Sequence, residues 1–158
     1  MRYERQLMLP EIGPEGQAKI KQARVLLVGV GGLGSPIALY LTGAGIGTLG
    51  LMDDDVVSNS NLHRQVLYAE EQLDQPKIDE AVKRLHSLNS EVCLKPYPFR
   101  LTSDNAASII SQYDMVIDGC DNFATRYIID DACRAAGIPY HFGQHELSFV
   151  AHGAQALT

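Results

Sequence analysis

The sequence predicts a single α/β domain built on a doubly wound, Rossmann-like parallel sheet. Two patterns favour this fold class: apolar runs of strand length alternate with runs of helix length, and a glycine-rich turn joins the first buried strand to the next helix. Strands that alternate with helices form parallel sheets through right-handed crossovers. The 158 residues, 46% hydrophobic and 20% charged, suit one globular domain.

The first half of the chain supplies two strands. Its predicted elements are a short helix over residues 15–23, a strand over 23–29, a helix over 33–45, a strand over 47–53 and a polar loop over 54–65. The run over 23–29 is continuously apolar, which is typical of a strand buried on both faces. Pro36 falls in the first turn of its helix, where a missing N–H costs nothing. Upstream, Arg2, Tyr3 and Gln6 are expected to dock an N-terminal helix.

The second half supplies three more strands. Its predicted elements are a helix over residues 77–89, a strand over 91–99, a helix over 103–113, a strand over 114–120, a helix over 122–137 and a strand over 138–142. Pro76 can open the first of these helices. Ser103 is expected to cap the second helix, and Gly137 to end the third. Five strands in alternation with helices complete the expected sheet.

The turn after the first strand carries a phosphate-binding pattern. Gly29, Gly31, Gly32 and Gly34 lie between a buried strand and a helix, where glycine lets the backbone approach a phosphate and the helix N-terminus offers unpaired N–H groups. Asp53 ends the second strand about twenty residues on, placed to accept hydrogen bonds from a ribose. The alternative is that the glycines serve only tight packing. The pattern predicts nucleotide binding but leaves NAD, FAD and ATP open.

Polar side chains gather where the later strands end. Asn61, Arg64 and Gln65 lie in the loop after the second strand, Lys77 begins the next helix, and Asp121 follows the fourth strand. The carboxyl ends of parallel strands meet at one edge of the sheet, where ligands bind. Two cations and an added carboxylate suit a triphosphate with magnesium, because cations stabilise charge on phosphates and a carboxylate holds Mg²⁺. This set favours phosphoryl or nucleotidyl transfer over hydride transfer.

Each of these side chains also has a plainer interpretation. By residue type Arg64 and Lys77 are ordinary surface charges, and only their place at the sheet edge favours a binding role. The acid and amide at 121–122 can cap the following helix. Asp54 and Asp55 are expected to be solvated loop acids rather than ligands.

Six short motifs occur in the order in which they occur in the ThiF/MoeB/HesA family, and through them the sequence resembles this family of bacterial relatives of the ubiquitin-activating enzymes. The resemblance runs over residues 2–140 and is slightly closer to the thiamine-pathway ThiF branch. It is carried by RYxRQ (2–6), GxGGLG (29–34), GAGxG (43–47), SNLxRQ (60–65), QPK (75–77) and DxxDNxxxR (118–126).

The resemblance implies a role for each candidate residue. The backbone of Gly32 packs against the nucleotide, Asp53 binds the ribose hydroxyls, and Asp121 holds magnesium. Arg5 reaches into the active site of a neighbouring subunit, so a homodimer is implied. The phosphates are contacted by Asn61, Arg64, Gln65 and Lys77.

The family reaction is an ATP-dependent adenylation. The C-terminal glycine carboxylate of a ubiquitin-like sulfur-carrier protein, which ends in Gly-Gly, attacks the α-phosphate of ATP and pyrophosphate leaves. Such carriers serve thiamine thiazole or molybdopterin biosynthesis. Because a carboxylate is already a nucleophile, positioning and charge neutralisation are expected to supply the rate without a general base. Two alternatives remain: a nucleotide-binding or dimerisation module without full activity, and a NAD-dependent oxidoreductase.

Charge and composition narrow the partners. The formal net charge of −6 argues against nucleic-acid and anionic-membrane binding. No apolar run is long enough to span a bilayer and no signal-peptide pattern opens the chain, so a cytoplasmic location is expected. Cys93, Cys120 and Cys133 form no CxxC pair, so the zinc site common in the family is not expected here. Cys120 and Cys133 are interpreted as small buried hydrophobes.

The end of the chain departs from the family pattern. Residues 1–140 form the expected adenylation domain, and residues 141–158 form an atypical tail. His141 and His145 have i,i+4 spacing, but without accompanying ligands a metal site there is not favoured. Since family members usually continue with further strands, the sheet is expected to be an incomplete version of the family sheet.

Overall fold

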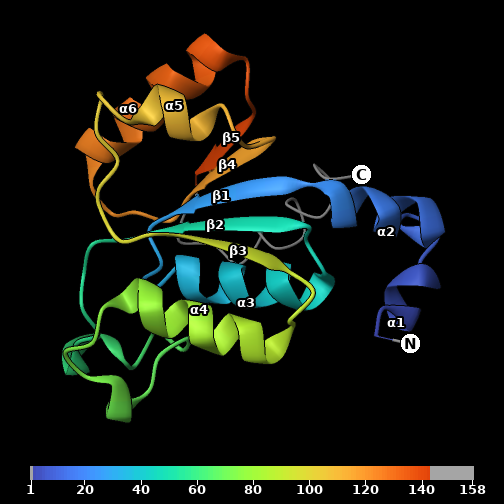
Figure 1. Ribbon diagram of the computed structural model, residues 1–158, viewed down its shortest axis with the longest axis horizontal. Coiled ribbons are helices and arrows are strands. Elements are labelled where there is room, and N and C mark those ends of the chain that lie inside the picture. The colour runs from blue at the N-terminus through green and yellow to red at the C-terminus, as the bar shows by residue number, and fades with distance from the viewer. Residues whose placement is uncertain (1, 143–158) are drawn as a thin grey trace.

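A five-stranded parallel sheet runs through the middle of the molecule, with helices on both faces (Figure 1). The computed structural model describes residues 2–142. The strands are β1 (Arg24–Val28), β2 (Thr48–Met52), β3 (Cys93–Tyr97), β4 (Met115–Asp118) and β5 (Tyr140–Phe142), in the order β3-β2-β1-β4-β5. The chain builds outward from β1 to β3 and then returns to place β4 on the other side of β1. The predicted doubly wound fold is confirmed.

Helices α3 and α4 cover one face of the sheet, and α5 and α6 cover the other, whereas α1 and α2 lie beyond its amino end (Figure 1). The helices are α1 (Glu4–Leu7), α2 (Gly13–Gln22), α3 (Gly34–Ala44), α4 (Lys77–Leu88), α5 (Ala106–Ile110) and α6 (Phe123–Ala136). Two single 3₁₀ turns, Asn59–Asn61 and Glu70–Gln72, interrupt the long connection between β2 and α4. Within residues 2–142 no helix is long and apolar enough to cross a bilayer.

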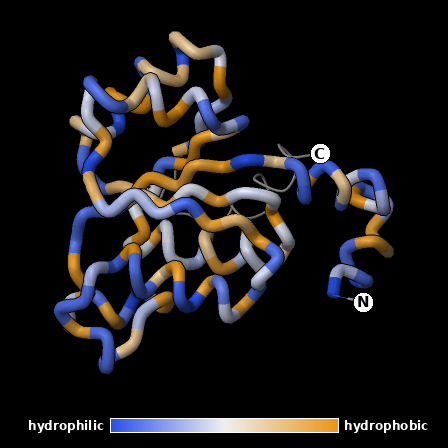
Figure 2. The backbone as a smooth tube through the Cα atoms, in the orientation of Figure 1, coloured by the Kyte–Doolittle hydropathy of each residue, from blue (hydrophilic) through white to orange (hydrophobic). Residues whose placement is uncertain are grey.

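Side chains that alternate along β1 divide the core into two layers. Val25 and Leu27 are fully buried under α3 and α4, while Leu26 and Val28 pack on the opposite face with Ile129 of α6. The tube of Figure 2 is accordingly hydrophobic along β1. Burial on both faces explains the continuous apolar run, since neither face of the strand meets water.

The predicted cap of the helix before β4 is wrong. Ser103 does not begin it: α5 starts at Ala106, with Asn105 in the N-cap position and no side-chain cap bond. The side-chain Oδ1 of Asn105 instead accepts the Thr102 backbone N–H at 2.8 Å. Because Thr, Ser, Asp and Asn follow one another here, residue type alone could not choose among the possible first turns.

The N-terminal segment is anchored at the ends of α3 and α4, far from the carboxyl edge of the sheet. Arg2 donates to the Leu88 carbonyl, and the Gln6 amide donates to the Ala44 carbonyl. Tyr3 accepts a hydrogen bond from Asn89 at 2.8 Å. The docking role expected for Arg2, Tyr3 and Gln6 is confirmed. The predicted tail over 141–158 and His145 lie outside the described residues, apart from the last two residues of β5.

Candidate functional site

A cavity of about 960 Å³ opens at the carboxyl ends of the central strands. It lies at the switch point where the chain, having built β2 and β3 on one side of β1, adds β4 on the other. Of the residues singled out in the sequence, its walls contain Gly29, Gly31, Gly32, Asp53, Arg64, Gln65, Lys77 and Asp121. The fold therefore brings together side chains from four separate segments of the chain.

The glycine turn leaves β1 at Gly29, whose φ of 88° is in the left-handed region. A Cβ at Gly29 would come within 2.8 Å of the Cys120 backbone N, so the turn touches the loop after β4. Gly34 begins α3 buried against the Gly29 carbonyl and does not line the cavity. Gly31 and Gly32 face the cavity instead. The turn thus offers side-chain-free backbone at the start of a helix, which suits an anion.

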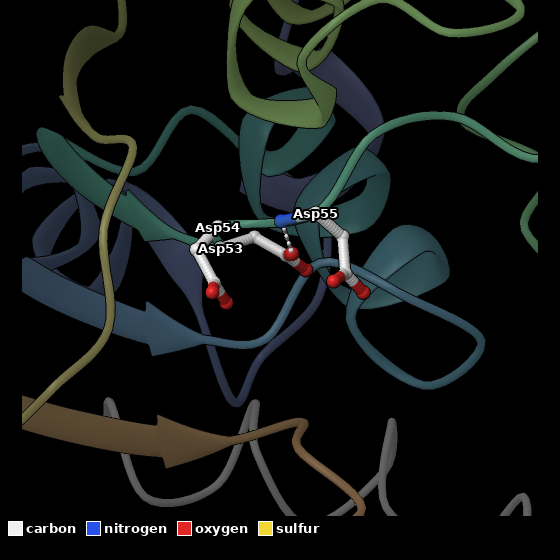
Figure 3. A group of neighbouring side chains, drawn as sticks. All are labelled: Asp53, Asp54 and Asp55. Carbon is white, nitrogen blue, oxygen red and sulfur yellow. Dashed lines mark hydrogen bonds between the residues drawn. The ribbon is translucent and has the colours of Figure 1, made fainter.

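Three consecutive acids follow β2 (Figure 3). Asp53 accepts hydrogen bonds from the backbone N–H of Val30 at 2.8 Å and of Asp55 at 3.0 Å, so it ties β2 to the glycine turn. The Asp54 carboxylate pairs with Arg100 at 2.7 Å. Carboxylate oxygens of the three acids lie within 4.8 Å of one another, a spacing that could suit a metal ion. Because each carboxylate already has a partner, we read the group as a structural network, and Asp54 and Asp55 are exposed as expected.

The two predicted cations reach the cavity in different ways. Lys77 is only 2% exposed and pairs through Nζ with Asp55 at 3.1 Å, so its interpretation as a surface charge is wrong. Arg64 is exposed and lies across Gly32, where an added Cβ would come within 3.3 Å of its Nε. Asn61 does not line the cavity; its side-chain oxygen accepts a hydrogen bond from Arg64 at 3.2 Å. Asn61 therefore orients Arg64 rather than facing the cavity itself.

Gln65 is the buried amide of the site. It is 5% exposed and lies beside Gly31, where an added Cβ would come within 3.2 Å of its Nε2. Within residues 2–142 its Oε1 has no hydrogen-bond partner. A buried polar atom without a partner is costly, so a ligand with a donor or a water would be stabilised there.

Asp121 stands on the loop between β4 and α6, exposed at the cavity wall. The helix cap foreseen for this dipeptide comes from Asn122, whose side-chain oxygen accepts the Thr125 N–H at 2.8 Å. Asp118, the first acid of the motif, is fully buried and pairs with Arg126 at 2.9 Å. Capping and pairing are thus carried by Asn122 and Asp118. Asp121 keeps its carboxylate free of any hydrogen bond within the described chain.

Some residues of the site fall outside these predictions. Phe99 and Arg100 line the cavity from the segment after β3, and Arg126 lines it from α6. The rule that ligands meet the carboxyl ends of strands would have pointed to Phe99 and Arg100. Arg5 is exposed on α1, beyond the opposite end of the sheet (Figure 1), so it lies outside this cavity.

The cysteines differ in accessibility, which predicts a selective alkylation pattern. Burial, together with the neighbouring Asp118, raises the pKa of Cys120 to about 12, and burial raises the pKa of Cys133 to about 11. Only the thiolate is nucleophilic. At pH 8 iodoacetamide is therefore expected to modify exposed Cys93 and to spare the other two until the protein is unfolded, as peptide mass spectrometry can check. The interpretation as a buried hydrophobe is confirmed for Cys133 but wrong for Cys120, which is half-buried at the cavity wall, so only its raised pKa protects it. Rapid labelling of Cys120 in the folded protein would contradict that raised pKa.

Similar proteins include several adenylyltransferases. The chain is 51% identical over 142 residues to the "Sulfur carrier protein adenylyltransferase" of Thermus thermophilus, covering 90% of this chain and 52% of that protein. It is 51% identical over 139 residues to "Adenylyltransferase and sulfurtransferase MOCS3" of Xenopus laevis, covering 88% of this chain and 31% of that protein. The chain thus spans about half the length of the first relative and about a third of the second.

Solved structures with the same fold are also similar in sequence to this chain. The E. coli tRNA N6-threonylcarbamoyladenosine dehydratase TcdA superposes with a TM-score of 0.85 at 28% identity, covering 92% of this chain and 62% of that one. Its complex with ATP superposes with a TM-score of 0.80 at 28% identity, covering 85% and 58%. The model of the ThiF family matches residues 3–148. The fold, the order of the motifs and this match agree: the chain belongs to the ThiF family.

Proposed function

We propose that the cavity binds ATP with Mg²⁺ and adenylates the C-terminal glycine of a small ubiquitin-like sulfur-carrier protein, releasing pyrophosphate. The observation that carries the proposal is the buried Lys77, which shares one cavity with Arg64, the glycine turn and Asp121, a carboxylate with no hydrogen bond within residues 2–142. A dinucleotide site for hydride transfer has little use for two cations and a free acid. Relatives named as adenylyltransferases, and a related structure solved with ATP, support the same function.

The donor set fits ATP. Gly31 and Gly32 offer backbone without side chains, and the start of α3 offers N–H groups to a phosphate. Lys77 and Arg64 supply positive charge, and the Oε1 of Gln65, which has no partner among the described residues, can accept a hydrogen bond. Asp53 uses its two oxygens on backbone N–H groups and keeps lone pairs for ribose hydroxyls. Each part of the nucleotide other than the base thus has a candidate partner.

Asp121 fits magnesium. Mg²⁺ in nucleotide sites is held by one or two carboxylates with substrate phosphates and waters, and Asp121 is an exposed carboxylate at the cavity wall. Bound there, the ion would neutralise charge on the phosphates. This chain would supply one carboxylate ligand, and the phosphates and waters would supply the others.

The proposed adenylation requires the protein mainly to position the two substrates and to neutralise charge on the phosphates. A carboxylate oxygen of the carrier forms a bond to the α-phosphorus, the bond from that phosphorus to the bridging oxygen breaks, and pyrophosphate takes the electron pair. No proton is transferred, so no general base is needed. Arg64 and Lys77 hold the phosphates and stabilise the charge that develops on the leaving group.

The assembly and pathway are also part of the proposal. Arg5 is exposed on α1 and outside the cavity of its own chain, which suits a role in the site of a second copy in a homodimer. The carrier would serve thiamine or molybdopterin synthesis in the cytoplasm. The acidic net charge of −6 offers no general basic surface for nucleic acid.

The proposal is tested by ATP–pyrophosphate exchange with carriers that end in Gly-Gly, one from the thiamine pathway and one from the molybdopterin pathway. Exchange that needs both the chain and a carrier is expected, and a carrier with its final glycine deleted is the control. ATP binding without exchange for either carrier would instead favour a nucleotide-binding module. Tighter binding of NADH than of ATP would favour an oxidoreductase.

A further inference from the structure

The loop that carries Asp121 is held by an ion pair between the fully buried Asp118 and the partly exposed Arg126. Asp118, the last residue of β4, accepts the Cys120 backbone N–H at 2.9 Å through one oxygen and Arg126 Nε at 2.9 Å through the other. Arg126 also donates from Nη2 to the Cys120 carbonyl at 3.4 Å. Both backbone groups of Cys120, the residue before Asp121, are therefore bonded to this one pair.

The guanidinium of Arg126 is fixed on its other sides as well. Its carbon lies 5.6 Å from the ring centre of Phe123 and 5.5 Å from that of Phe142, within the range of cation–π attraction. The Asp118 carboxylate has no exposed surface. A buried carboxylate depends on its partner, and the guanidinium is fixed because its Nε bonds Asp118 while its Nη2 bonds the Cys120 carbonyl.

The start of the loop packs directly on β1 and on the glycine turn. The Gly119 N–H donates to the Val28 carbonyl at 2.7 Å. A Cβ at Gly119 would lie 2.7 Å from the Gly29 carbonyl oxygen, so the loop rests directly on the glycine turn. The position of Asp121 relative to that turn is thus determined by the contacts of Gly119 and Cys120.

We propose that Asp118 and Arg126 are positioning residues that hold Asp121 against the glycine turn and so set the affinity of the site for the magnesium ion of the nucleotide. The inference rests on the proposed function. Arg126 lines the cavity, but its Nε and one terminal nitrogen are committed to Asp118 and Cys120. The inference therefore assigns Arg126 a role in the geometry of the loop.

The test is Arg126→Lys, which keeps the positive charge beside Asp118 but loses the planar fork that also reaches Cys120. Residues behind a metal ligand typically change metal affinity by about 10–100-fold. We expect the Mg²⁺ concentration for half-maximal exchange to rise about tenfold by that rule, with the rate recovering at saturating Mg²⁺. Electron paramagnetic resonance of bound Mn²⁺ should show a matching loss of Mn²⁺–ATP affinity, while ATP binding in EDTA stays unchanged.

Arg134→Lys is the matched control, because Arg134 lies on the same helix and pairs with Asp130 at 2.8 Å on the surface. It is expected to leave the metal dependence unaltered. The inference is overturned if Arg126→Lys loses activity at all Mg²⁺ concentrations alike. It is equally overturned if metal-free ATP binding weakens as much as Mn²⁺–ATP binding, since Arg126 would then contact phosphate itself.

A readout that needs no catalysis separates this inference from the proposed function. Hydrogen exchange at the Cys120 amide, which is bonded to Asp118 at 2.9 Å, should be faster in Arg126→Lys than in Arg134→Lys, because the loop loses its bond at the Cys120 carbonyl. If the native chain shows neither exchange activity nor ATP binding, the proposed function fails, while the amide exchange still decides whether the pair holds the loop. Equal amide exchange in the two variants would sink the inference even in an active enzyme.

Discussion

Replacing Gly34 by alanine is expected to destabilise the protein by about 3 kcal/mol or more, the upper range for overpacking a well-packed interior. An added Cβ would overlap the Gly29 carbonyl oxygen and lie 2.9 Å from the carbonyl carbon. These are backbone atoms of the glycine turn and cannot move aside as a flexible side chain can. The turn would have to open, so the same substitution should also abolish ATP binding.

Gly43 provides the matched control, because it lies on the same helix with nothing within 4 Å of its added Cβ. Gly43→Ala is expected to be neutral or to stabilise by about 0.5–1 kcal/mol through helix propensity. Urea unfolding of the two variants measures the difference. A Gly34→Ala protein as stable as Gly43→Ala would show that the turn is far looser than its contacts indicate.

These glycines show how much of the fold is contained in local sequence. The apolar run of β1 and the turn after it were predictable, because burial on both faces and a strand-to-helix turn each leave a short, regular pattern. Asn105 was not predictable as the N-cap of α5, since Thr102, Ser103 and Asp104 compete for the same local hydrogen bonds. Where several residue types could cap a helix equally well, tertiary contacts decide which of them does.

The candidate site divides in the same way. Which residues line the site followed from the rule that the carboxyl ends of parallel strands meet at one edge of the sheet. That rule correctly grouped Arg64, Lys77 and Asp121 in one cavity. Their individual environments did not follow from it. Lys77 is buried and Asn61 faces Arg64, both consequences of how the connection between β2 and α4 folds back on itself. Burial is a property of that packed loop and has no short sequence pattern.

The burial of Lys77 leads to the largest expected effect on activity. Lys77→Met keeps an unbranched side chain of similar length in the buried space and removes only the charge. Losing one group that stabilises charge on the reacting phosphates is expected to lower the exchange rate by about 10²–10³, or about 2.7–4 kcal/mol. Stability should change little, because the Asp55 carboxylate left without its partner is 63% exposed and stays solvated. Exchange kinetics and urea unfolding on the same preparation measure both quantities.

Two further variants decide what the charge does. Lys83→Met removes a lysine from the same helix, whose side chain is 70% exposed and whose Nζ pairs with Glu80. It should leave the exchange rate within about twofold, as for surface substitutions. Asp55→Asn keeps Lys77 but removes its carboxylate partner. If the ammonium acts on phosphate, Asp55→Asn should retain most of the activity that Lys77→Met loses. If instead the two variants lose activity equally, the pair acts by fixing the loop after β2, and the buried cation is structural. The roles of Asp55 and Lys77 can thus be separated. Only Lys77 is buried, where its charge is weakly screened by water and acts strongly on a nearby phosphate.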